Sequence, residues 1–308
     1  MMLKRYHRSM RLKESQLMPF DPACPFCLSI KRAVVNELQK DPVINLLLCR
    51  DCHAVSVSRM PTAETISSFY NSYYHEKSYY GQEKKVTFDL TRKFARHLVG
   101  IASQYIDGQQ LSILDFGGGD GSMAVELAKE FLKRGRSKID ITVVDYNELL
   151  SPVDDDRICL KHAMDIEALP KETYTLVIAS AVLEHLPQPG KILSNLLDLV
   201  KIRGLLYART PYMLPLMKAA SAVGLQWDFH YPSHLHDLGA SFWNGVFSHI
   251  NLHHKFEIII SQPSIVETSF KNHFVRTLSA YTLKLPWYLI GNHYKMVGGW
   301  EVFALKKD

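Results

Sequence analysis

The stretch Ile113-Leu-Asp-Phe-Gly-Gly-Gly-Asp-Gly121 decides the fold of this 308-residue chain. An apolar run ends in the acidic Asp115 and enters a glycine-rich turn, and a helical pattern follows from Ser122 to Lys133. Glycine lets the backbone approach a ligand closely, and the N-terminus of a helix offers free N–H groups to an anionic group. The order strand, glycine turn and helix therefore predicts a nucleotide-binding pocket.

Two glycine spacings compete for this turn. The dinucleotide fingerprint G-x-G-x-x-G is met at Gly117 and Gly119, but Ser122 stands in the place of its third glycine. The spacing D-x-G-x-G-x-G is met in full by Asp115, Gly117, Gly119 and Gly121. The first spacing would indicate an oxidoreductase that uses NAD. The second resembles motif I of the class I S-adenosylmethionine (SAM)-dependent methyltransferases.

Strand and helix patterns alternate after this point. The expected strands are Ile113–Phe116, Ile139–Asp145, Ile158–Lys161, Tyr174–Ser180, Gly204–Arg209 and, later, Phe256–Ile260. Helices are expected from Ser122 and over Lys191–Val200, and Thr210-Pro211 is expected to stop the fifth strand. This alternation is typical of a parallel sheet with helices on both faces, whose ligands bind at the carboxyl ends of the strands.

The polar residues at those strand ends are the candidate ligand contacts. Asp145 ends the second strand, where an acid can accept hydrogen bonds from both hydroxyls of a ribose. Asp165 follows the third strand and either accepts a bond from an adenine amino group or caps the turn Ile166–Leu169. Ser180 closes the fourth strand and leads into Val182-Leu-Glu-His-Leu186.

In order and spacing, these stretches resemble the successive motifs of class I methyltransferases over residues 85–265. The resemblance implies an α/β, Rossmann-like domain with a mostly parallel seven-stranded sheet, for which Trp300–Leu305 would supply the antiparallel last strand. It also implies SAM as cofactor, with its amino-acid end at Gly117–Gly121, its ribose on Asp145 and its adenine on Asp165. Asp115 and Ser180 complete the expected cofactor-binding set.

Two cysteine pairs, Cys24-Pro-Phe-Cys27 and Cys49-Arg-Asp-Cys52, precede this domain. Two C-x-x-C knuckles at this separation suit a tetrahedral zinc site of zinc-ribbon type, which would be structural because four thiolates leave no open position. A redox dithiol and unligated cysteines are the alternatives. Leu28 and His53 stand where a knuckle often has glycine, and His53 is itself a possible ligand. Cys159 is expected to be a buried apolar residue.

The front of the chain also resembles a branch of the family that carries an N-terminal cysteine-rich zinc module, and some members of that branch are sugar C-methyltransferases. The expected organisation is a basic tail (1–18), a zinc-ribbon-like module (19–60), a linker and leading helix (61–110), and the methyltransferase domain (111–308) with a substrate-covering insertion around 211–250. A solvated tail is favoured over a transit peptide.

Histidines supply the candidate proton acceptors for methyl transfer to a neutral carbon or hydroxyl. His185 follows the fourth strand, and Tyr231 and His234 lie in the histidine-rich segment 228–237, which also holds His230 and His236. We expect His234, with Tyr231 nearby, and His185 to be catalytic. The alternatives are a structural role and a metal site made of His234, His236 and Asp237.

Two aromatic segments have two readings each. Tyrosines between Tyr70 and Tyr80 either cover the pocket or pack a linker onto the next domain. The segment Phe270–Gly291 is either an interfacial helix that contacts a lipid-linked substrate or, as we favour here, a helix and loop that cover the sheet edge.

Composition allows several functions. A hydrophobic content of 47%, five cysteines and no apolar run long enough to span a membrane predict a cytoplasmic protein without a transmembrane segment. The leading hypothesis is SAM-dependent methyl transfer to a small molecule, possibly a sugar or nucleotide sugar. An RNA methyltransferase that grips RNA with the zinc module is the alternative, favoured by the basic pI of about 8.8 and the basic N-terminal tail but not by any basic stripe near the knuckles. A non-catalytic subunit with this fold is a third reading.

Overall fold

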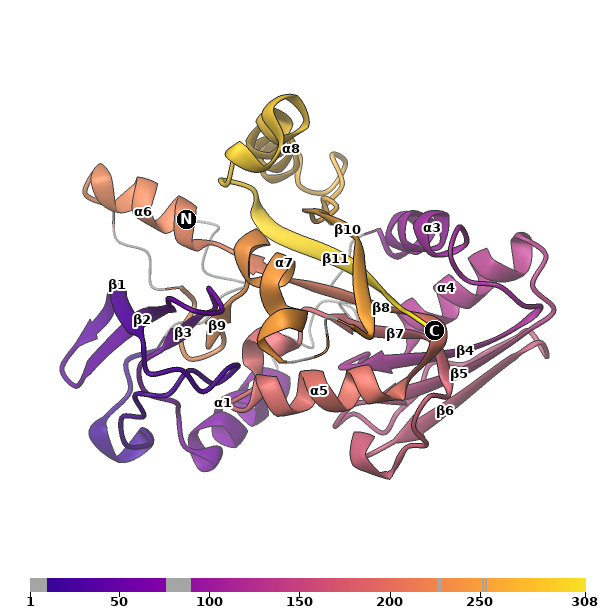
Figure 1. The fold of residues 1–308 in the computed structure, drawn as a ribbon, viewed down its shortest axis with the longest axis horizontal. Coiled ribbons are helices and arrows are strands. Elements are labelled where there is room, and N and C mark those ends of the chain that lie inside the picture. The colour runs from indigo at the N-terminus through magenta and orange to yellow at the C-terminus, as the bar shows by residue number, and fades with distance from the viewer. Residues whose placement is uncertain (1–9, 76–89, 226–228, 251, 253) are drawn as a thin grey trace.

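The computed structural model describes residues 10–75, 90–225, 229–250, 252 and 254–308, with the side chains of 70–75 excepted. Its main body is a seven-stranded sheet (Figure 1). The strands are β4 (Gln110–Phe116), β5 (Lys138–Val144), β6 (Ile158–Ala163), β7 (Tyr174–Ser180), β8 (Val200–Tyr212), β10 (Phe256–Pro263) and β11 (Gly298–Lys306).

The strand order is β10-β11-β8-β7-β4-β5-β6, and only β11 runs against its neighbours. The chain builds outward from β4 to β6 and then returns to β7 on the other side of β4. This reversal is the topological switch point at which open α/β sheets bind ligands. The order and the antiparallel β11 confirm the expected Rossmann-like methyltransferase fold.

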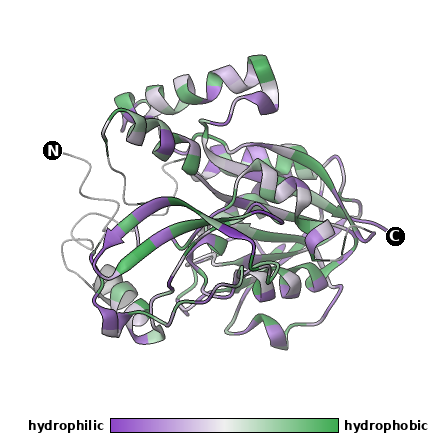
Figure 2. Cartoon of the chain, turned by 60° about the vertical axis from the view of Figure 1, so that its left-hand side comes forward, coloured by the Kyte–Doolittle hydropathy of each residue, from purple (hydrophilic) through white to green (hydrophobic). Residues whose placement is uncertain are grey.

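Helices cover both faces of this sheet because its strands alternate apolar side chains between the faces. Ile113, Ile141 and Ile178 pack with α3 (Thr91–Ala102) and α4 (Ser122–Lys133). Leu114 and Val177 face the opposite way, toward α5 (Pro189–Leu199) and α7 (Ala240–His249). The central strands are mostly hydrophobic in Figure 2, as burial on both faces requires.

Several strands are longer than expected, and the end of β8 is the clearest case. β8 does not stop at Thr210-Pro211 but continues to Tyr212. Proline is tolerated there because β8 pairs with β7 only as far as Arg209, while Pro211 pairs with Gly299 of β11.

The N-terminal module is a second, four-stranded sheet of order β1-β2-β3-β9, all antiparallel. Its strands are β1 (Arg32–Lys40), β2 (Val43–Cys49), β3 (Val55–Val57) and β9 (His236–Asp237). The last strand comes from the segment after β8, so the expected insertion around 211–250 joins the module to the main domain. Leu12 and Leu17 of the tail are buried, and Gln39 bonds to the backbone N–H and carbonyl of Leu12, whereas residues 13–15 are exposed.

The remaining elements are connections. They are η2 (Glu14–Gln16), α1 (Ala63–His75), η3 (Ile166–Ala168), η4 (Leu183–His185), α6 (Leu214–Ala222), α8 (Phe274–Ile290) and η5 (Gly291–His293). Tyr79 and Tyr80 lie outside the described residues, and so do the side chains of the tyrosines from Tyr70 to Tyr74. In the described part of the chain, no helix is long and apolar enough to cross a membrane.

Candidate active site and cysteine cluster

The glycine turn after β4 has the backbone shape that its sequence predicts. Gly117, Gly119 and Gly121 adopt φ of +74°, +60° and +76°, a region that disfavours side chains. A Cβ on Gly117 would lie 2.7 Å from Cγ2 of Val182, which follows β7. The turn therefore packs directly against the segment that leads to His185.

Asp115 points its carboxylate into this turn. Its side chain is buried, its Oδ2 atom has no hydrogen-bond partner among the described residues, and a Cβ on Gly118 would lie 2.5 Å from that atom. Burial, followed by the nearby charge of Asp145, raises the pKa of Asp115 to about 7. An orphaned carboxylate oxygen beside a glycine turn fits a cationic donor such as the ammonium group of SAM.

Asp145 and Asp165 hold neighbouring positions at the same edge. Asp145, which follows β5, accepts a hydrogen bond at Oδ2 from the Gly119 N–H (2.9 Å) and one at Oδ1 from the Asn147 N–H (2.9 Å). The exposed Asp165 caps η3 by accepting a bond from the Glu167 N–H (2.8 Å), which is the capping role considered above. Tyr146 and Met164, next to these acids and 97% and 64% exposed, offer apolar surfaces that the strand-end analysis missed.

The end of β7 carries a buried ionic group. Ser180 Oγ accepts a bond from Arg209 Nε (3.1 Å), and the Arg209 guanidinium pairs with Glu267. Glu184, also buried, has an Oε2 atom without a hydrogen-bond partner among the described residues. Burial raises the pKa of Glu184, although the positive charges of His185 and Arg209 oppose this shift.

His185 and His234 lie together beside Glu184. One ligand atom of each of these three residues lies within 4.8 Å of the others, and the two imidazole rings have centroids 5.1 Å apart. His185 Nδ1 donates to the Ser233 carbonyl (2.6 Å), which turns Nε2 toward Glu184 Oε1 at 3.9 Å. Two imidazoles and a carboxylate at this spacing can move a proton or bind a divalent cation.

Backbone contacts bring the loop that holds His234 to this place. The Leu235 N–H donates to the Glu184 carbonyl (2.7 Å), and His236 Nε2 donates to the Leu186 carbonyl (2.8 Å). Sequence separation hid this arrangement, because nearly fifty positions lie between η4 and the loop. Glu184 is thus a candidate residue that the sequence analysis quoted only as part of a motif.

Three other polar residues of the loop have structural contacts. His236 is fully buried and accepts a bond at Nδ1 from Ser56 Oγ (2.9 Å), and Asp237 accepts the N–H groups of Met213 and Leu214 at the start of α6. The alternative metal site of His234, His236 and Asp237 is therefore wrong. Tyr231 is buried and donates its hydroxyl to the Arg59 carbonyl (3.3 Å).

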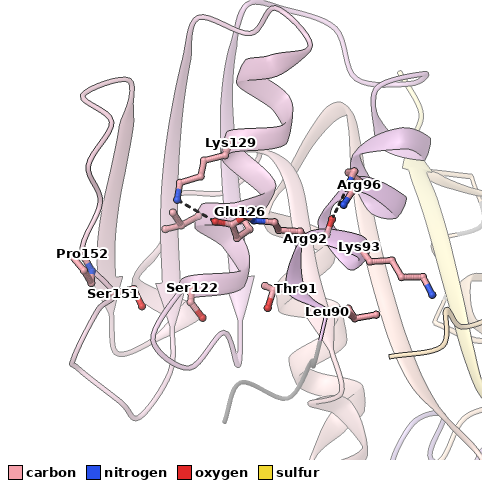
Figure 3. A pocket seen from close by; sticks show the side chains of 11 residues that line it. Leu90, Thr91, Arg92, Lys93, Arg96, Ser122, Glu126, Lys129, Ser151 and Pro152 are labelled. Carbon is pink, nitrogen blue, oxygen red and sulfur yellow. Dashed lines mark hydrogen bonds and ion pairs between the residues drawn. The ribbon is translucent and has the colours of Figure 1, made fainter. Parts of the chain in front are cut away.

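A pocket of about 650 Å³ lies beside the start of α4, between α3 and α4 (Figure 3). Arg92, Lys93, Arg96 and Lys129 contribute to its walls, and Glu126 pairs with both Arg92 and Lys129. Its lining includes Ser122 but none of the strand-end acids or histidines. We therefore regard it as a hollow next to the site rather than the site itself.

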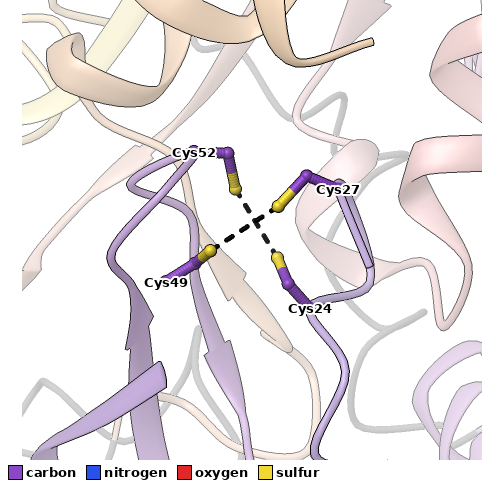
Figure 4. Close-up of side chains that lie close together, drawn as sticks. All are labelled: Cys24, Cys27, Cys49 and Cys52. Carbon is purple, nitrogen blue, oxygen red and sulfur yellow. Dashed lines mark hydrogen bonds between the residues drawn. The ribbon is translucent and has the colours of Figure 1, made fainter. Parts of the chain in front are cut away.

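The four knuckle cysteines converge (Figure 4). The Sγ atoms of Cys24 and Cys52 lie 3.5 Å apart, and those of Cys27 and Cys49 lie 3.6 Å apart. A tetrahedral zinc ion with Zn–S bonds of about 2.3 Å separates its sulfur ligands by about 3.8 Å, whereas a disulfide brings them to about 2.05 Å. All four are free cysteines, and the geometry fits zinc.

At both knuckles a residue other than glycine adopts the backbone conformation that glycine usually provides. Leu28 and His53 both adopt φ of +61°, the conformation for which glycine is preferred, and their N–H groups donate to the Cys24 and Cys49 carbonyls. Both side chains are exposed, and His53 is not among the residues that converge. His53 is therefore not a ligand in this structure.

Comparison with known proteins decides the family. A family model described as "Methyltransferase domain" matches residues 86–254, which is more than half of the chain. The chain belongs to this methyltransferase family. The seven-stranded sheet with its antiparallel β11 agrees with this assignment.

This methyltransferase is 30% identical over 128 residues to malonyl-[acyl-carrier protein] O-methyltransferase of Bacillus cereus, a match that covers 40% of this chain and 46% of that protein. The plantazolicin methyltransferase BpumL, solved with SAH and a triazolic desmethylPZN analog, is 15% identical, with a TM-score of 0.47, and covers 80% of this chain and 91% of that one. A complex of the Haloferax volcanii Trm112 methyltransferase activator with a methyltransferase is 11% identical, with a TM-score of 0.43, over 71% of this chain and 92% of that one.

Proposed function

We propose that this methyltransferase transfers the methyl group of SAM to a carbon or oxygen of a small molecule, with a sugar or nucleotide sugar as the first candidate. The observation that carries the proposal is the Glu184–His185–His234 cluster after β7. It supplies a proton acceptor at the edge of the sheet where the cofactor is expected. The front of the chain, with its likeness to sugar C-methyltransferases, supports the choice of acceptor.

The cofactor contacts follow from the strand ends. In this proposal Asp115 Oδ2 accepts a hydrogen bond from the ammonium group of SAM. The carboxylate of SAM lies against the N–H groups of the turn Gly117–Gly121. Asp145 holds the ribose, Asp165 lies at the adenine, and Tyr146 and Met164 offer faces to the ring. Ser180 acts indirectly, because it fixes Arg209 at the end of β7.

The chemistry is an in-line displacement at the methyl carbon. The bond between that carbon and the SAM sulfur breaks, the bond to the acceptor forms, and the sulfur leaves as the neutral thioether of S-adenosylhomocysteine. The acceptor loses one proton. We assign this proton to Nε2 of His185. The hydrogen bond from Nδ1 to the Ser233 carbonyl holds the imidazole in place, and the Glu184 carboxylate stabilises the imidazolium that forms. His234 orients the acceptor beside it.

We also propose that Cys24, Cys27, Cys49 and Cys52 hold one structural zinc ion. Four sulfur ligands leave the ion no open position, so it takes no part in methyl transfer. The ion ties the two knuckles to each other. The first knuckle in turn contacts the main domain, because Phe26 packs on Phe242 of α7 with ring centroids 4.7 Å apart.

Methyl-labelled SAM tests the proposed acceptor class. The purified protein is incubated with a cell lysate that has been divided into small-molecule, RNA and protein fractions. We expect label in the small-molecule fraction, and we expect the Glu184→Gln variant to transfer it at least about a hundredfold more slowly while it still binds SAM. Label in the RNA fraction would overturn the proposal and recast the cysteine module as an RNA-binding element.

A further inference from the structure

Helix α8 (Phe274–Ile290) presents an apolar stripe to solvent. The exposed side chains recur at intervals of three, four and seven residues, which place them on one side of the helix. They are Phe274, Leu278, Leu285 and Tyr288, flanked by Val275 and Leu289, whereas the Tyr281 ring stacks on Phe270 and its hydroxyl accepts a bond from Lys93 of α3 (2.6 Å). Leu285 is 58% exposed and Leu289 is 79% exposed, so the stripe is not merely the rim of a packed surface.

The side of α8 next to the stripe fixes the orientation of the helix. Thr277 and Lys284 are buried, and the Thr277 hydroxyl bonds to that of Thr268 (2.7 Å). Lys284 Nζ donates to the carbonyl of Ser264, and the Trp287 ring packs edge-on against Trp300 at 6.0 Å. Thr277, Lys284 and Trp287 thus anchor α8 to the main domain and leave the stripe exposed, and Figure 1 shows the helix at the outer margin of the molecule, beyond β11.

The charge around the stripe has one sign. The 33 residues from Thr268 to Trp300 contain no aspartate or glutamate, while Lys271, Arg276 and Lys295 are exposed. A second copy related by a two-fold axis would bring like charges together at this face. An anionic lipid surface instead attracts the cations and takes up the apolar side chains.

We propose that α8 binds this methyltransferase to the surface of an anionic membrane. The helix lies in the interface, with Phe274 and Tyr288 at the level of the head groups. Its length of 17 residues and its buried Lys284 suit this arrangement rather than a span. The inference is independent of the acceptor and of the assigned base.

Flotation with vesicles tests the proposal. The full chain is mixed with vesicles of phosphatidylcholine alone or of phosphatidylcholine with phosphatidylglycerol. We expect binding to the anionic vesicles, weakened by salt, and a loss of about tenfold or more for Leu285→Glu together with Leu289→Glu. Lys271→Glu with Lys295→Glu should abolish the preference for anionic lipid.

The matched control is Leu225→Glu, which places the same change at an exposed leucine after α6 and should leave binding unchanged. Near-ultraviolet circular dichroism shows whether each variant is folded. Equal binding by the wild type and by the α8 double variant would overturn the proposal. So would a failure to bind either vesicle, and so would a concentration-dependent dimer that the double variant loses, because that result identifies a second copy as the occupant.

Discussion

At the scale of single residues, Asp115 couples the cofactor site to pH. Its pKa rises from 3.8 to about 7 through burial and then through Asp145. The Asp115 carboxyl keeps its proton in the native state up to about pH 7, whereas in the unfolded chain it loses the proton above about pH 4. Its contribution to the free energy of unfolding is therefore fully present below about pH 4 and is lost as the pH rises through about 7. In this pH range the free energy of unfolding of the wild type should fall by up to about 1.4 kcal/mol per pH unit because of Asp115. Urea unfolding should show that Asp115→Asn abolishes this part of the fall.

Burial also raises the pKa of Asp237 to about 7, so two groups contribute to the pH dependence of the wild type. The difference between the wild type and Asp115→Asn isolates the contribution of Asp115. Asp140→Asn is the matched control, since the half-exposed Asp140 lies within β5 away from the turn. It should keep the slope of the wild type. An Asp115→Asn variant with that same slope would show that the carboxyl is not protonated at neutral pH in the free protein.

The assigned base makes a second prediction at this scale. His185→Ala and Glu184→Gln should lower kcat by about 10²- to 10⁴-fold, because removal of a positioned base costs that much. The dissociation constant of SAM should stay unchanged. His53→Ala, which removes an exposed imidazole, is the control and should keep full turnover. Unaltered turnover in both site variants would remove the cluster from the mechanism.

At the scale of elements, the knuckles carry a cost that glycine would relieve. Leu28 has φ of +61° and is 77% exposed, so its side chain contributes little packing. We expect Leu28→Gly to raise the free energy of unfolding by about 0.5–1 kcal/mol, measured by chemical denaturation, since leucine is strained in this region. Val223→Gly is the control at φ of −106°, where glycine should destabilise. A destabilised Leu28→Gly variant would contradict this account.

The local sequence predicts helices and strands better than it predicts the tertiary contacts between them. The helix Ser122–Lys133 and the strand Tyr174–Ser180 were expected with the bounds that the structure has, because glycine turns and apolar periodicity are local signals. The end of β8 was not, since Pro211 is accommodated by pairing with the distant β11. The partners of His185 and the burial of His236 also depend on long-range contacts that no local pattern records.

At the scale of the whole molecule, the cysteine module and the main domain share one core. Three of the four knuckle cysteines belong to the same buried cluster as Leu193 of α5 and Trp243 of α7. A Cβ on Gly190 would lie 2.7 Å from the Pro25 carbonyl oxygen, so the start of α5 touches the first knuckle. The two parts should therefore unfold together.

Zinc removal tests this coupling. Elemental analysis should find one zinc ion per chain, lost in Cys24→Ser and kept in Cys159→Ser. A chelator should lower the Tm of a single unfolding transition seen by calorimetry, because binding to the native state alone adds to its stability. Two separate transitions, of which only one responds to the chelator, would show that the module folds on its own.

The cofactor site is tested most directly by calorimetric titration of SAM into the wild type, Asp115→Asn and Asp140→Asn. The account predicts one SAM per chain for the wild type and for Asp140→Asn, and binding weakened by about tenfold or more for Asp115→Asn, because a charge-assisted bond to a buried carboxylate is lost. Equal affinity in all three proteins would contradict it, since SAM would then bind without the carboxylate that the glycine turn surrounds.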